Sequence, residues 1–214
     1  MEVVSRAEAL FRGFDARRSV RHFSDDPVPR EAIEWAIRCA STAPSGAHLQ
    51  PWRFVAIADP TRKKQLRHAV EEEERHTYEA RMPEAWRQAI APMGTTWEKP
   101  YLEVVPWVVI AFAEAHRVGE EGTRETNYYV KESVGLACGF FIAALHQMGL
   151  ATLPHTPSPM GFLTTFCGRP PNERPFILFP VGFPTRDCRV PDITRKPLSE
   201  VAVFDEDLPP LAGL

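Results

Sequence analysis

Residues 17–54 constrain the fold of this chain more than any other stretch. Two polar clusters, Arg17-Arg18-Ser19-Val20-Arg21 and Pro44-Ser45-Gly46-Ala47, flank one amphipathic segment. Apolar residues recur along that segment at the spacing of one helix face, namely Ile33, Ala36, Ile37 and Ala40. A helix of that length holds the two clusters roughly 20 Å apart, at about 1.5 Å per residue. A ligand that touches both must therefore be long, or the clusters must meet across a symmetry axis.

Each cluster by itself fits either a ligand or plain surface. Arginine offers a planar fork of donors, and Ser19 adds a hydroxyl, which together suit a phosphate group. A solvated basic turn next to the first helix has the same composition. Ser45 and Gly46 lie in a proline-flanked loop that can present backbone N–H groups to a flat or anionic ligand. An ordinary turn is the alternative there.

Composition favours one domain and excludes several classes of partner. The chain has 214 residues, of which 44% are hydrophobic, enough for a sizeable core in one domain spanning 1–214. The formal net charge of −3 argues against a surface that binds nucleic acid. The charged N-terminus does not fit a signal peptide, and the longest apolar run, 134–145, is too short to span a bilayer. We therefore expect a cytoplasmic protein that is not membrane-bound.

The four cysteines predict neither a metal site nor a redox dithiol, because none forms a C-x-x-C pair. Cys39 and Cys138 lie in apolar helical contexts, so both are predicted to be buried small hydrophobes.

The order of the predicted elements indicates an α+β sandwich. Helices are expected over 5–12, the segment before Pro44, 59–75, 83–90, 126–148 and 159–167. Strands are expected over 53–58, 106–112, 150–153 and 176–182. The helix over 126–148 is apolar nearly all round, which predicts a buried core helix. Residues 71–101 mix charge with large rings, as in a lid, and 184–214 are expected to be extended.

Two motifs together carry a specific resemblance. RRSVRxF, followed by ASTAPSGAHLQPWRF, resembles the opening of the nitroreductase-like flavoprotein superfamily. Further along, EEEERHTYEARM, TTWEKPYLE, NYYVKESVGLACGFFIAAL, CGRPP, FPVGFP and VPDITRKPL resemble, in order, segments of the iodotyrosine deiodinase branch. The resemblance covers roughly residues 16–201. It implies a mixed sheet flanked by helices and an intertwined homodimer, with FMN at the interface and a tail wrapping the partner.

The resemblance also implies roles for individual residues. Those matching the family's FMN contacts are Arg17, Arg18, Ser19, Arg21, Pro44, Ser45, Gly46, Thr156 and Arg195. Thr156 matches a threonine whose hydroxyl faces flavin N5. Ala47 matches a residue whose backbone N–H contacts the substrate phenolate. Pro154 and His155 depart from the family's threonines, so their contacts stay open.

Three lid residues match the family's substrate clamp, and their chemistry suits a free amino acid. Glu74 provides an anion for the ammonium group, and Lys99 provides a cation for the carboxylate. Tyr78 lies four residues after Glu74, on the same face if the helix persists. The expected reaction is therefore FMN-dependent reductive dehalogenation of halotyrosines, with iodotyrosine giving tyrosine and iodide.

Three other functions stay open at this stage. One is a general nitroreductase or quinone reductase, which would need no amino acid clamp. Another is a flavin-fragmenting dimethylbenzimidazole synthase, and the last is a halotyrosine-binding flavoprotein without turnover. The expected electron donor is NAD(P)H, acting directly or through a flavin reductase or ferredoxin.

Overall fold

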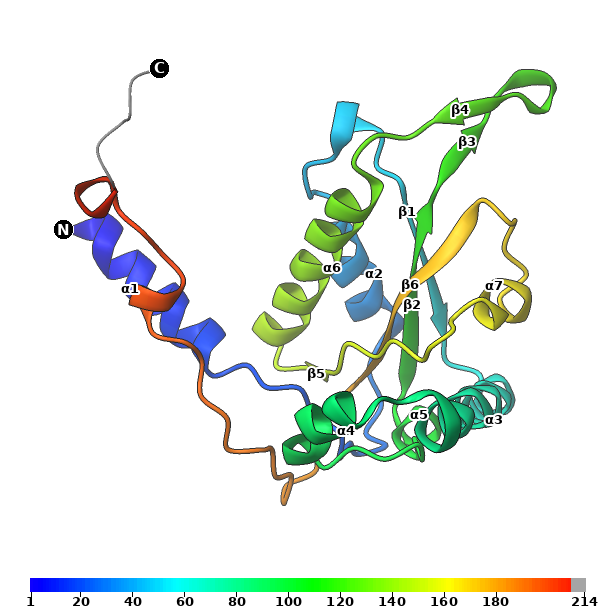
Figure 1. Cartoon of the computed structure of the whole chain (residues 1–214), viewed down its shortest axis with the longest axis horizontal. Coiled ribbons are helices and arrows are strands. Elements are labelled where there is room, and N and C mark those ends of the chain that lie inside the picture. The colour runs from blue at the N-terminus through cyan, green and yellow to red at the C-terminus, as the bar shows by residue number, and fades with distance from the viewer. Residues whose placement is uncertain (209–214) are drawn as a thin grey trace.

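A computed structural model describes residues 1–208 of the chain (Figure 1). Its centre is a four-stranded sheet in the order β1-β2-β6-β5. The strands are β1 (Trp52–Ile57), β2 (Trp107–Glu114), β5 (Ala151–Thr152) and β6 (Glu173–Gly182). Neighbouring strands run antiparallel, and a parallel bridge joins Ser19 to Thr152 at the β5 edge. The sheet is therefore mixed, and all four predicted strands are confirmed.

Helices cover both faces of this sheet. They are α1 (Glu2–Asp15), α2 (Arg30–Ala40), α3 (Pro60–His76), α4 (Glu84–Ile90), α5 (Tyr101–Val104), α6 (Val130–Gln147) and α7 (Phe162–Phe166). A π-helical turn, Thr77–Arg81, continues α3. Short 3₁₀ turns lie at Gly46–His48, Ala91–Met93, Glu120–Gly122, Leu198–Glu200 and Asp205–Asp207. The predicted helices are all present, within a few residues of their expected bounds.

The alternation of side chains along β2 explains why both faces are covered. Successive residues of a strand point to opposite faces, and here both sets are apolar. Val108, Ile110 and Phe112 belong to a core that includes residues of α3, α5 and α7. The two residues between them, Val109 and Ala111, belong to a second core with residues of α2 and α6. The chain is therefore a three-layer sandwich, confirming the predicted α+β class.

Local chemistry fixes two of the helix ends. The Asp59 side chain accepts a hydrogen bond from the Arg62 N–H at 2.7 Å, which caps the start of α3 as predicted. Gly149 follows α6 with φ of +76°, the left-handed conformation in which glycine commonly ends a helix.

Three predictions differ from the structure: where α6 begins, how fully α6 is buried, and whether Cys39 is buried. Helix α6 begins at Val130 rather than Thr126, because Arg124–Thr126 forms β4 and pairs with β3 (His116–Val118). One face of α6 is open in the single chain, with Leu136 47% and Phe140 42% exposed. Cys138 is buried as expected, but Cys39 is exposed because it lies on the outer face of α2.

Helix α1 and the tail after Pro184 extend away from the sandwich (Figure 1). Helix α1 has no buried residue, and large apolar side chains of both segments are exposed. Between residues 184 and 208 the structure has only the 3₁₀ turns Leu198–Glu200 and Asp205–Asp207, and the rest of the predicted tail, 209–214, lies outside the described residues. Within residues 1–208, no helix could cross a membrane and no His, Cys, Asp or Glu cluster could hold a metal ion.

Candidate active site

A basic cavity of about 410 Å³ lies where the segment after α1 meets the C-terminal tail. We call it the arginine cavity. It brings together five of the residues predicted to contact a cofactor, namely Arg17, Arg18, Ser19, Arg21 and Arg195. These residues come from both ends of the chain, so the cavity depends on the tail folding back beside α1.

Backbone contacts hold these segments in place. The parallel bridge fixes Ser19 to the β5 edge, and the Val20 N–H donates to the Thr152 carbonyl at 3.3 Å. Arg195 donates through Nη1 to Asp15 Oδ1 at 2.7 Å and through Nη2 to the Arg17 carbonyl at 3.0 Å. The tail is therefore tied to the end of α1.

The arginine cavity is short of negative charge. Burial lowers the pKa of Arg17, and the positive charges of Arg195 and Arg18 lower it further. The Nε atom of Arg21 is buried and has no hydrogen-bond partner among residues 1–208. Clustered guanidinium groups and a hydroxyl, with one buried donor unpaired, are the donor set that a phosphate monoester would satisfy.

A second cavity, of about 210 Å³, lies between the lid and the segment after β5. We call it the clamp cavity. It brings together five predicted site residues, Arg21, Glu74, Tyr78, Lys99 and Thr156. Glu74 and Tyr78 line the same cavity, although the α-helix gives way to a π-helical turn between them.

Glu74 is the centre of the clamp cavity. Its Oε2 lies 3.4 Å from Lys99 Nζ, and its Oε1 lies 2.9 Å from His155 Nε2. Glu74 and His155 are each 8% exposed and Lys99 is 2% exposed, so the ion pair is largely desolvated. Lys99 Nζ also lies 5.4 Å from the centroid of the Tyr78 ring, within range of a cation–π contact.

Burial and charge act against each other at these groups. Burial by itself would raise the pKa of Glu74, but the His155 hydrogen bond and the Lys99 charge outweigh it and hold the pKa below its ordinary value. Burial lowers the pKa of Lys99, and Glu74 opposes that shift. The clamp cavity therefore holds one buried anion and one buried cation side by side.

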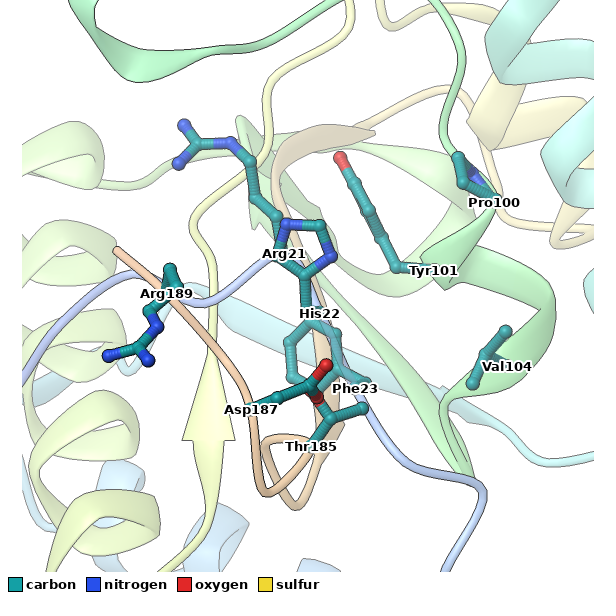
Figure 2. Close-up of a pocket in the computed structure, with 9 residues that line it drawn as sticks. All are labelled: Arg21, His22, Phe23, Pro100, Tyr101, Val104, Thr185, Asp187 and Arg189. Carbon is teal, nitrogen blue, oxygen red and sulfur yellow. The ribbon is translucent and has the colours of Figure 1, made fainter. Parts of the chain in front are cut away.

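The two cavities are adjacent, because Arg21, Leu153 and Pro154 line both. Arg21 and Tyr101 also border a third cavity, of about 450 Å³ (Figure 2). In that view the Arg21 guanidinium and the Tyr101 hydroxyl point to the same side, away from Asp187. Arg21 therefore lies at the junction of all three cavities.

The loop Pro44–Ala47 does not reach either the arginine cavity or the clamp cavity. It packs at the N-terminal end of α6, where the Gly46 N–H donates to Ser133 Oγ at 3.2 Å. A Cβ atom on Gly46 would lie 2.5 Å from the Tyr128 carbonyl oxygen, so this approach requires glycine. Ala47 has φ of 49°, which only a tightly held loop sustains. Within a single chain, Pro44, Ser45, Gly46 and Ala47 therefore lie apart from the predicted site residues that line the two cavities.

Sequence reasoning left one functional contact open and missed others. His155, which was noted only as a departure from the family's pattern, contacts Glu74. Glu71 accepts a hydrogen bond from the Lys99 backbone N–H at 2.7 Å, and Trp86 and Met82 line the clamp cavity. No local sequence signal identifies these residues, because each contact joins segments far apart in the chain.

Comparisons with known proteins show which family this chain belongs to. Residues 15–183 match the Nitroreductase family. An iodotyrosine deiodinase from Haliscomenobacter hydrossis is 49% identical over 202 residues, covering 94% of this chain and 91% of the relative. Iodotyrosine deiodinase 1 from Homo sapiens is 40% identical over 203 residues, covering 94% of this chain and 70% of the relative.

A solved structure is similar along nearly the whole chain. It is a crystal structure of oxidized iodotyrosine deiodinase bound to FMN and 3-iodo-L-tyrosine, with a TM-score of 0.78 and 28% identity. The alignment covers 91% of this chain and 100% of that chain. The chain therefore belongs to the nitroreductase family, in its iodotyrosine deiodinase branch.

Proposed function

We propose that this protein is an FMN-dependent reductive dehalogenase of halotyrosines. The observation that carries the proposal is the buried Glu74–Lys99 pair beside Tyr78, in a cavity adjacent to a cluster of arginines. A zwitterion needs one anion and one cation close together, and a simple phenol or nitroaromatic compound needs neither. The relatives named iodotyrosine deiodinase support the same reaction.

FMN fits the arginine cavity by the chemistry of its donors. Arg17, Arg18, Ser19 and Arg195 would hold the phosphate, and the unpaired Nε of Arg21 would find an acceptor on the cofactor. Thr156 would face the flavin ring from the clamp side. FMN, when bound and reduced, would supply the two electrons that, with one proton, replace the carbon–halogen bond by a carbon–hydrogen bond and release halide.

The clamp residues bind and orient the amino acid part of the substrate. The substrate carboxylate would pair with Lys99, and the substrate ammonium would pair with the Glu74 oxygen that Lys99 contacts in the free protein. Two ion pairs with the substrate would thus replace the Glu74–Lys99 pair. Tyr78 adds a hydrogen-bonding hydroxyl next to them. Because the lid covers this site, binding would also exclude water from the halogen-bearing ring.

A homodimer would complete the site with the loop Pro44–Ala47. The loop lies at the N-terminal end of α6, while His146, near its other end, contacts Gly13 just before the arginine cavity. The 18 residues of α6 span roughly 27 Å at 1.5 Å per residue. Antiparallel packing of two α6 helices through the exposed Leu136 and Phe140 would bring the loop of one chain to the arginine cavity of the other.

In that dimer, α1 and the tail 184–208 would lie along the partner, which would cover their exposed apolar side chains. The Ser45 and Gly46 segment and the Ala47 backbone N–H would then reach the flavin ring and the substrate phenolate. The reducing equivalents would come from NAD(P)H, directly or through a flavin reductase or ferredoxin.

Halide release tests this function directly. With dithionite as reductant, we expect iodide from 3-iodotyrosine and also from 2-iodophenol, which has no zwitterion. Lys99→Met should lower kcat/KM for iodotyrosine by about 30-fold or more, since it removes a partner from a desolvated ion pair. Lys64→Met, at an exposed position of α3, is the matched control.

The same assay separates the rival functions. A general reductase would lose no more activity on iodotyrosine than on iodophenol when Lys99 is replaced. Equal losses on both substrates would mean that the clamp residues support the fold, and the substrate assignment would fail. Thr156→Ala should keep FMN and iodotyrosine bound but slow iodide release, which distinguishes a role beside the flavin from a role in binding.

A further inference from the structure

His155 is a third buried member of the clamp that the proposed function does not use. Its Nε2 lies 2.9 Å from Glu74 Oε1, on the carboxylate oxygen that Lys99 does not contact. The two segments are separated by 81 residues in the chain, so this contact is a product of tertiary packing. The family resemblance assigns no role to a histidine here.

The hydrogen bond defines the tautomer of His155. An ionised carboxylate can only accept, so Nε2 must carry the proton in the neutral ring. Nδ1 is then an acceptor, and it is buried without a partner among the described residues. His155 therefore presents a donor to Glu74 and keeps a second, unused site for a proton.

The sheet holds the backbone of His155 in place. The His155 N–H donates to the Leu178 carbonyl at 2.8 Å, and the Leu178 N–H donates back at 2.9 Å. The ring contacts Tyr101 edge-on, with centroids 6.2 Å apart and planes at 75°. Glu74 belongs to the lid, so His155 is a rigid point to which the lid carboxylate is attached.

We propose that His155 is a positioning residue that switches the clamp with pH. This rests on the proposed function. In its neutral form His155 holds Glu74 Oε1, so that Oε2 is free for the substrate ammonium once the zwitterion displaces Lys99. When Nδ1 takes up a proton, the imidazolium neutralises Glu74 and competes with the ammonium for the same carboxylate.

The charges around the ring set the direction of this competition. The charged and titratable groups that face His155 are Glu74 of α3, Lys99 of the lid, Arg21 of the segment after α1, and Tyr101 of α5. Before protonation, Glu74 is balanced by Lys99 or by the substrate. An added imidazolium leaves a surplus positive charge beside Lys99 and Arg21, so halotyrosine binds less tightly.

The pKa of His155 has the direction that such a switch requires. Burial lowers this pKa below its ordinary value, while Glu74 opposes the shift and Lys99 and Arg21 add to it. The ring is therefore neutral at neutral pH and becomes charged only at a pH below the ordinary range of histidine. Clamp function is present above the folded-state pKa and is lost as pH falls through it.

The pH dependence of substrate preference tests the proposal. The ratio of kcat/KM for 3-iodotyrosine to that for 2-iodophenol cancels the titration of the phenol that both carry. Because kcat/KM reports groups of the free enzyme, we expect this ratio to fall by up to about tenfold per pH unit below the His155 pKa.

Two substitutions separate the titration from the hydrogen bond. His155→Gln keeps a neutral N–H donor, so the ratio at neutral pH should stay within a few-fold of the parent and lose its acid limb. His155→Leu removes the donor, so KM for iodotyrosine should rise about tenfold or more at every pH, while iodophenol is unaffected. An acid limb that persists in His155→Gln, or equal losses on both substrates in His155→Leu, would overturn the proposal.

A spectroscopic readout does not depend on turnover. The ring ¹⁵N signals of His155 in the FMN-loaded protein can be assigned with His155→Gln and followed against pH. We expect Glu74→Gln, and separately saturating L-tyrosine, to lower the apparent His155 pKa, because each removes the free carboxylate that stabilises the imidazolium. An unchanged His155 pKa in both cases would refute the switch. If the His155 pKa falls as expected but the protein releases no iodide, only the proposed function would be refuted.

Discussion

Glu74→Gln in the substrate-free, FMN-loaded protein is the most direct test of a desolvated clamp. The substitution leaves the Lys99 ammonium buried, at 2% exposure, with no carboxylate 3.4 Å away. At that distance the lost attraction is about 5 kcal/mol for an effective dielectric constant of about 20. Breaking a buried pair by removing one partner costs about 3–5 kcal/mol in stability.

The loss has an upper limit, because Lys99 can release its proton instead. From its ordinary pKa of 10.5, deprotonation at pH 7 costs about 4.8 kcal/mol at 1.36 kcal/mol per pH unit. In the variant the folded-state pKa of Lys99 lies further below the unfolded value than in the parent. The folded state then binds fewer protons, so the destabilisation should shrink as pH rises toward 10.5.

Urea denaturation at fixed protein concentration measures this loss. Glu73→Gln is the matched control on the preceding residue, since Glu73 pairs with Arg81 where the side chains are 25% and 45% exposed. That variant should lose less than about 1 kcal/mol. The double variant Glu74→Gln/Lys99→Met should recover most of the stability, because no unpaired charge remains. A loss below about 1 kcal/mol for Glu74→Gln, without pH dependence, would refute a desolvated pair.

Three further predictions concern the cofactor, the loop and the dimer. Arg17→Ala should weaken FMN binding by about tenfold or more, measured by fluorescence titration, because a charge-assisted hydrogen bond to phosphate is lost. Gly46→Ala should lower stability by about 1–3 kcal/mol in thermal denaturation, because its Cβ would lie 2.5 Å from the Tyr128 carbonyl oxygen. Leu136→Glu should give monomers with little FMN in light scattering after size exclusion, whereas Val118→Glu, on the exposed β3–β4 hairpin, should leave both properties unchanged.

The main helices, the strands of the central sheet and the α+β class could be predicted from the sequence. Alternation and helical spacing are local properties of the chain, so the four strands of the central sheet, the Asp59 cap and the Gly149 helix end follow from the sequence, whereas β3 and β4 were missed. The two polar clusters could be identified as well, because their composition is local. The residues of the clamp required the family resemblance, since a glutamate, a tyrosine and a lysine are ordinary surface residues by composition.

Which charges are buried, and what they contact, depends on tertiary packing. The acidic run Glu71–Glu74 points around a helix, and only Glu74 continues the buried face of Leu66 and Val70. No local rule predicts what it contacts there. Packing of α3 against the segment after β5 places Glu74 at His155, and packing of the lid places Lys99 beside both. The open face of α6 and the exposed Cys39 were mispredicted for the same reason. Burial depends on which element covers a side chain, and that element comes from elsewhere in the chain or from a second subunit.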